Sequence, residues 1–186
     1  MRKSVRVWDP LVRLFHWLLV VCFTLNAFVL DDDSPAHEYI GYAVLALVVV
    51  RLVWGVIGPV NARFSTFPPS LTAAMRHLEK IARGIPDHTV SHNPLGALMI
   101  YNLLATMLAL GLTGHLLVQP GFHDSDILEE LHELLSAWGV FSVVVHVAAV
   151  VFESQRTGVN LVKAMLTGNK EISDARGSDK IAEEQA

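Results

Sequence analysis

The chain has 186 residues, of which 52% are hydrophobic and only 17% are charged. Soluble globular domains carry about 25% charged residues, so this composition argues against a soluble enzyme, and its hydrophobic content excludes disorder over most of the chain. A net charge of −4 argues against nucleic-acid binding, and the single cysteine, Cys22, excludes a disulfide scaffold. The class that remains is a small membrane protein that crosses the bilayer several times.

Four apolar segments are long enough to cross a bilayer, which takes about 20 mostly apolar residues. Lipid offers the backbone no hydrogen-bond partners, so these segments must be helices, and their continuous apolar runs exclude a β-barrel. The segments are residues 11–30, 39–57, 95–118 and 131–152. The first is expected to stay as a span, because Asp31 and its acidic neighbours follow it instead of a signal-peptide cleavage site. The sequence predicts an all-α membrane protein with a four-transmembrane-helix bundle.

Charge predicts the orientation of these spans. All 14 lysines and arginines fall at the start of the chain, around the second connection or in the tail. The positive-inside rule therefore places both termini in the cytoplasm and the first and third connections on the opposite side. These two connections carry the acidic residues Asp31, Asp32, Asp33, Glu38, Asp124, Asp126, Glu129 and Glu130.

A further helix is predicted in the long second connection, after the start signal Pro68-Pro69-Ser70. Its apolar residues share one face and its basic residues lie elsewhere, which is typical of an amphipathic helix on the cytoplasmic membrane surface. The sequence predicts a transmembrane domain over residues 1–168 and a polar, disordered cytoplasmic tail over residues 169–186.

The nine histidines are the unusual feature of this composition, because ionisable residues inside a membrane are costly and mark function by default. Five lie in or at the ends of the spans: His16, His37, His115, His132 and His146. His146 follows His132 by 14 residues, so it lies roughly 21 Å along the same helix and within about 40° of the same face.

Depth then suggests two pairs, His16 with His146 near the inner side and His37 with His132 near the outer side. Paired imidazoles on facing helices can hold a b-type haem, and two depths imply two haems. Zinc would require ligands at one level, and a proton relay would usually involve buried carboxylates, which the spans lack. No Cys-x-x-Cys-His motif for covalent haem attachment is present.

Several motifs resemble the bacterial cytochrome b561 family, including the b-type cytochrome subunits of nickel–iron hydrogenases. They are VWDPLVRLFHW at residues 7–17, RLVWG at 51–55, ARFS at 62–65, HNPLGA at 92–97 and LHE at 131–133. The resemblance implies two b haems, with iron ligands His16, His146, His37 and His132. It also implies a bacterial inner-membrane protein that exchanges electrons between quinone and a redox partner on the periplasmic side.

Two further residues are candidate cofactor contacts. Arg51 could pair with a haem propionate, because guanidinium groups match carboxylates well, or it could simply anchor the span at the cytoplasmic surface. His115 lies near the outer end of the third span, where it could bind a propionate, take protons from quinol or face the membrane surface.

The expected function is electron transfer from quinol to a periplasmic acceptor such as a c-type cytochrome, with quinol oxidoreductase activity as an open question. The acidic outer loops would attract a basic partner, or they only satisfy the topology. The alternatives are a membrane-anchor cytochrome b subunit of a larger, hydrogenase-like oxidoreductase and a haem-free transporter. Membrane lipid is an expected partner, and a homo-oligomer is left open.

Overall fold

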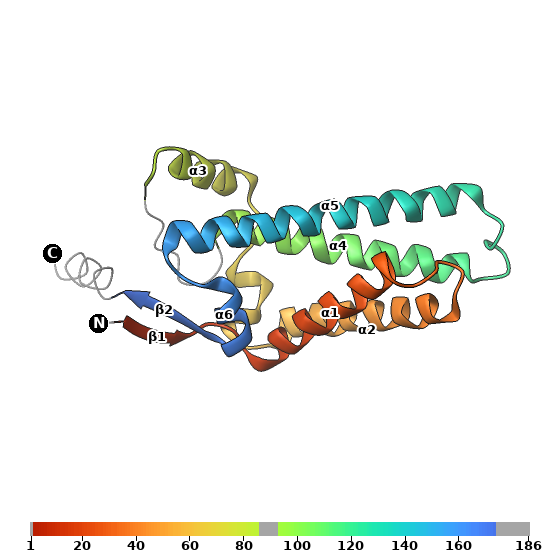
Figure 1. Cartoon of the computed structure of the whole chain (residues 1–186), viewed down its shortest axis with the longest axis horizontal. Helices are drawn as coiled ribbons and strands as arrows, with labels where there is room; N and C mark the ends of the chain where they lie inside the picture. Colours follow the sequence, from red (N-terminus) through yellow and green to blue (C-terminus); the bar gives the residue numbers. More distant parts are fainter. Residues whose placement is uncertain (1, 86–92, 174–186) are drawn as a thin grey trace.

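The computed structural model describes residues 2–85 and 93–173 of the chain. Four long helices lie along the long axis of the molecule (Figure 1), and in the described residues each is long and apolar enough to span a membrane. The elements in chain order are β1 (Arg2–Arg6), α1 (Pro10–Phe28), α2 (Pro35–Ile57), two short 3-10 turns (Val60–Ala62 and Phe64–Thr66), α3 (Leu71–Ala82), α4 (Pro94–Leu117), α5 (Asp126–Thr157), α6 (Leu161–Thr167) and β2 (Asn169–Ser173). The predicted all-α membrane bundle is confirmed.

Local sequence signals define where three of the spanning helices begin. The side chains of Asp9, Ser34 and Asn93 accept bonds from backbone N–H groups of the first turn, at 2.7 to 3.2 Å. A proline follows each cap, at a helix position whose N–H would have no partner. The Ser34 bond goes to the backbone N–H of His37, so the same signal sets the position of that histidine in the first turn of α2.

The apolar core of the bundle is small and lies among α1, α2 and α4. Most other large apolar side chains are exposed on the outside of the bundle, where lipid would cover them. A polar cluster joins α4 to α5, because Asn102 donates to the Ser142 hydroxyl at 2.9 Å and accepts from the Trp138 indole at 3.1 Å. The core residues are Phe15, Phe23, Val44, Val48, Leu104 and Met107.

The bundle has two distinct ends (Figure 1). β1, β2, α3 and α6 lie at one end, which we call the terminal end, and the α1–α2 and α4–α5 connections lie at the other, which we call the loop end. At the terminal end the carbonyl of Gly168 accepts bonds from the backbone N–H groups of Val7 at 2.9 Å and Trp8 at 3.2 Å. Gly168 has a φ of 85°, which favours glycine, and this turn brings β2 alongside β1.

Two predicted boundaries change. The fourth span was expected over residues 131–152, but α5 runs from Asp126 to Thr157, because charged residues extend the helix beyond its apolar part. Residues 169–173, which the sequence analysis assigned to the tail, form β2 and pair antiparallel with β1. Backbone pairing of this kind needs no apolar side chains, so composition gives no signal for it. Residues 174–186 lie outside the described residues, as do His88 and His92.

Candidate functional site

His16 of α1 and His146 of α5 face each other inside the bundle. Their ring centres are 6.4 Å apart and the ring planes are inclined by 58°. Both side chains are half-buried. Two imidazoles that bind one iron from opposite sides have ring centres roughly 6 Å apart, since each metal–nitrogen bond is about 2 Å long. The observed separation therefore fits a pair of axial ligands.

His37 of α2 and His132 of α5 lie toward the loop end. The two side chains are half-buried and close enough to act on each other electrostatically. His37 lies in the first turn of its helix, whereas His132 lies in the second turn of α5, because α5 begins at Asp126. The structure thus brings together the second of the two histidine pairs suggested by depth.

The ring nitrogens of these histidines have unequal surroundings. Nδ1 of His16 and Nδ1 of His37 are buried without a hydrogen-bond partner. Nδ1 of His132, in contrast, lies 2.7 Å from the hydroxyl of Thr113 on α4. Buried polar atoms without partners are rare in proteins and call for a ligand or water. The unpartnered nitrogen of His16 therefore suits a bound group, and the facing rings of His16 and His146 can supply nitrogen ligands from two sides.

The histidines do not gather into a single compact metal site. Within residues 2–85 and 93–173, no three histidine, cysteine, aspartate or glutamate side chains are placed to hold one metal ion. A structural zinc site takes four such ligands at one point. Two separate pairs suit two centres that each obtain their remaining ligands from a macrocycle.

Arg51 is buried near the terminal end of α2, with only 4% of its surface exposed. One guanidinium nitrogen, Nη2, donates to the carbonyl of Ala62 at 3.2 Å, and the guanidinium stacks on the Phe64 ring. The other terminal nitrogen, Nη1, is buried without a hydrogen-bond partner. A residue that only anchors a helix at the membrane surface would extend its charge into water. An inward-facing cation with a free donor suits a carboxylate of a bound group.

His115 lies on the outside of the loop end and belongs to neither histidine pair. Its Nδ1 is 3.0 Å from the phenol oxygen of Tyr42, so the bond joins α4 to α2. Both side chains are exposed. Because both side chains are exposed, the two groups can exchange a proton with a molecule that reaches this surface of the bundle.

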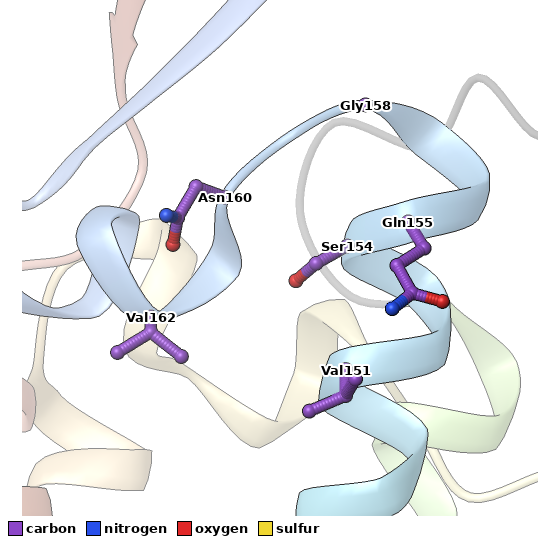
Figure 2. Close-up of a pocket in the computed structure, with 6 residues that line it drawn as sticks. All are labelled: Val151, Ser154, Gln155, Gly158, Asn160 and Val162. Carbon is purple, nitrogen blue, oxygen red and sulfur yellow. The ribbon is translucent and has the colours of Figure 1, made fainter.

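A shallow pocket between the end of α5 and the start of α6 has a different role (Figure 2). The Ser154 hydroxyl donates to the carbonyl of Val150 at 2.7 Å and accepts from the backbone N–H of Leu161 at 3.2 Å. The polar groups of this pocket therefore stabilise the turn between α5 and α6. The lining contains no histidine and consists of Val151, Ser154, Gln155, Gly158, Asn160 and Val162.

Sequence reasoning missed three residues that contact the predicted ones: Thr113, Tyr42 and Phe64. Thr113 and Tyr42 lie on helices different from those of the histidines they contact. Phe64 lies in a 3-10 turn after α2 and reaches back to Arg51. Hydroxyl and aromatic residues are common in spans, so no local spacing marks Thr113 or Tyr42. Phe64 lies in the ARFS motif at residues 62–65, but that motif did not indicate its contact with Arg51.

Comparison with known proteins gives one match. A family model described as prokaryotic cytochrome b561 matches residues 7–168. Comparisons with curated proteins and with solved structures gave no match. The matched stretch includes both histidine pairs, Arg51 and His115.

Proposed function

The chain belongs to the prokaryotic cytochrome b561 family, and from this premise we propose that it transfers electrons from quinol in the bacterial inner membrane to an acceptor in the periplasm. Family membership makes the chain a multi-pass membrane cytochrome that binds b-type haem and transfers electrons. The observation that carries the finer proposal is the facing pair of His16 and His146, with ring centres 6.4 Å apart.

In this proposal each histidine pair holds one haem, His16 with His146 and His37 with His132. A b haem with two imidazole ligands supplies one-electron exchange, because neither side of its iron is open to substrate. The 14-residue separation of His132 and His146 puts the two sites roughly 21 Å apart along α5, measured between Cα atoms. The two pairs therefore divide the thickness of the membrane between them.

Arg51 is proposed to bind a propionate of the haem at the terminal end. Its free Nη1 donor supports this role, and a buried arginine next to a carboxylate satisfies both charges. From the positive-inside rule we propose that this end of the bundle lies on the cytoplasmic side.

Tyr42 and His115 are proposed to accept the protons of quinol at the loop end. Quinol releases protons together with electrons, so its oxidation requires a base within hydrogen-bond reach. The bonded pair lies on α2 and α4, the helices that also carry His37 and Thr113, and both of its side chains are exposed. His115 would take the first proton of quinol, and the hydrogen bond from Tyr42 would orient the imidazole ring of His115.

The acceptor is proposed to be a basic protein of the periplasm, such as a c-type cytochrome. The acidic residues of the two loop-end connections support this choice, and Asp32 and Asp124 are almost fully exposed. Exposed charges of one sign raise the encounter rate with an oppositely charged partner.

The proposal is tested by a reduced-minus-oxidised absorption spectrum of the purified protein, with the haem counted as its pyridine complex. We expect two b haems in each chain. His16→Ala and His37→Ala should each remove one haem, and the remaining haem should differ in spectrum and potential between the two variants. His123→Ala, in the exposed α4–α5 connection, is the matched control and should keep both haems.

One haem in the wild-type chain, or loss of the same haem from both variants, would show that the proposed pairs are wrong. A chain without haem, from cells well supplied with it, would refute the electron-transfer function and favour a transporter.

A further inference from the structure

We propose that Thr113 is a positioning residue that keeps the proton of His132 on Nδ1 and so leaves Nε2 as the nitrogen that would bind the haem iron at the loop end. The inference rests on the proposed function, because it assumes that His132 is an axial ligand. It adds a residue outside the histidine pairs that sets the protonated nitrogen, the orientation and the donor strength of one ligand.

The hydroxyl of Thr113 is fixed within its own helix. Thr113 is buried, with 7% of its surface exposed. Its Oγ1 lies 2.9 Å from the carbonyl oxygen of Ala109 and 3.2 Å from that of Leu110. A hydroxyl has one proton, and a carbonyl oxygen can only accept, so the Thr113 proton is directed at α4's own backbone.

This arrangement decides which nitrogen of His132 carries the proton. Oγ1 of Thr113 lies 2.7 Å from Nδ1 of His132. In the proposed arrangement the hydroxyl proton stays on the α4 backbone, so the oxygen accepts a hydrogen bond from Nδ1–H of His132. The neutral ring then has its lone pair on Nε2, which is the form that binds a metal.

The position of the ring supports the same conclusion. Gly114 follows Thr113, and a Cβ atom at Gly114 would lie 3.3 Å from Cε1 of His132, so the ring packs closely against the α4 backbone. Nδ1 of His16 is buried without a hydrogen-bond partner, and Nδ1 of His37 lies 3.7 Å from the exposed carboxylate of Asp32, beyond hydrogen-bond distance. His132 is therefore held by a side-chain bond that these two histidines lack.

A consequence for the haem potential follows from this bond. A histidine that donates its second N–H becomes a stronger electron donor to the metal, and this favours the oxidised iron. Removal of the acceptor should raise the midpoint potential of the loop-end haem and leave the other unchanged. We expect a change of up to about tenfold in the reduction equilibrium, or about 59 mV for a one-electron couple.

The test is an equilibrium redox titration of the purified protein and three threonine variants. Thr113→Val keeps the shape of the side chain and removes the oxygen, whereas Thr113→Ser keeps the oxygen. Thr106→Val is the matched control, because Thr106 lies on the same helix, is similarly buried and donates its hydroxyl proton to the backbone carbonyl of Asn102, at 2.8 Å. His37→Ala identifies the transition of the loop-end haem by its loss.

The expected result is an upward shift of that transition in Thr113→Val, with wild-type potentials in Thr113→Ser and Thr106→Val. Loss of the loop-end haem from Thr113→Val alone would also support the inference, because the valine variant keeps the shape of threonine but lacks the hydroxyl that the serine variant retains. Unchanged potentials in Thr113→Val, or equal shifts in the valine and serine variants, would overturn it. Fewer than two haems in the wild-type chain would instead overturn the proposed function, and the inference with it.

Discussion

The guanidinium carbon of Arg51 lies 4.7 Å from the centre of the Phe64 ring. Phe64 belongs to the 3-10 turn that follows α2, and its ring covers Gly55 of the same helix. The Phe64 ring therefore covers the buried guanidinium of Arg51, which lies one turn before Gly55 on α2. Contacts between a cation and an aromatic ring contribute about 2 kcal/mol when they are shielded from water. This stacking orients the donor group that we assign to a haem propionate.

Gly55→Ala should disturb this arrangement. A Cβ atom at residue 55 would lie 2.0 Å from Cε2 of Phe64, so the ring must move. We expect a loss of about 1–3 kcal/mol of stability, as for other overpacked positions, measured as a lower thermal unfolding temperature of the haem-loaded protein. Gly121→Ala is the control, since a Cβ atom there meets nothing within 4 Å. Equal unfolding temperatures for the wild type and Gly55→Ala would contradict the packing described.

Arg51→Gln should lower the midpoint potential of the haem at the terminal end. A positive charge beside a haem favours its reduced state, so removal of the charge favours the oxidised state. We expect a decrease of about tens of millivolts, where 59 mV corresponds to a tenfold change, in a redox titration. Arg63→Gln, at an exposed arginine that donates to the carbonyl of Gly58 at 2.6 Å, should leave both potentials close to wild type. An equally large shift of the midpoint potential in Arg63→Gln would contradict the assignment of Arg51 to a haem propionate.

Tyr42→Phe and His115→Gln should slow reduction of the haems by quinol without changing haem content. The phenol and the imidazole are 3.0 Å apart, and each variant removes one partner of the bond. Loss of a general base typically costs a factor of at least about 100 in rate, and we expect the larger effect from His115→Gln. Stopped-flow reduction by quinol measures the rate, with dithionite as a reductant that needs no base. Wild-type rates in both variants would place quinol oxidation elsewhere.

Ser142→Ala should destabilise the contact between α4 and α5. Ser142 has 2% of its surface exposed and accepts from Asn102 at 2.9 Å, so the variant leaves an amide donor unpaired in an apolar setting. Interhelical bonds in membranes contribute about 0.6–2 kcal/mol, and a matching loss should appear in detergent unfolding. Ser65→Ala, at an exposed serine, is the control and should have no effect.

Replacement of Asp31, Asp32 and Asp33 by asparagine should slow electron transfer to a basic acceptor cytochrome. These carboxylates lie in the α1–α2 connection, are exposed and carry no positive neighbours in that connection. We expect a decrease of about tenfold at low ionic strength, with a weaker dependence on salt. The rate with a small uncharged acceptor should be unchanged. A basic cytochrome that reacts equally fast with both proteins would show that these loops serve topology alone.

The sequence predicted much of the fold because the membrane imposes simple rules. Each span had to be a continuous apolar helix, and α1, α2 and α4 begin within four residues of the predicted positions. The pairing of β1 with β2 was missed, since backbone hydrogen bonds between short polar strands leave no pattern in the side chains. The length of α5 was underestimated because helix formation continues into polar residues at both ends of its apolar part.

The four spans, the expected depth of each histidine and the predicted common face of His132 and His146 all follow from residue number, because helix geometry converts it into height and angle. Which side chains from different helices meet was not predictable in this way. The contact of Thr113 with His132, that of Tyr42 with His115 and that of Phe64 with Arg51 depend on how the helices pack and where the chain turns back. Such contacts depend on the rotation and spacing of neighbouring helices, and no periodicity within a single helix records these quantities.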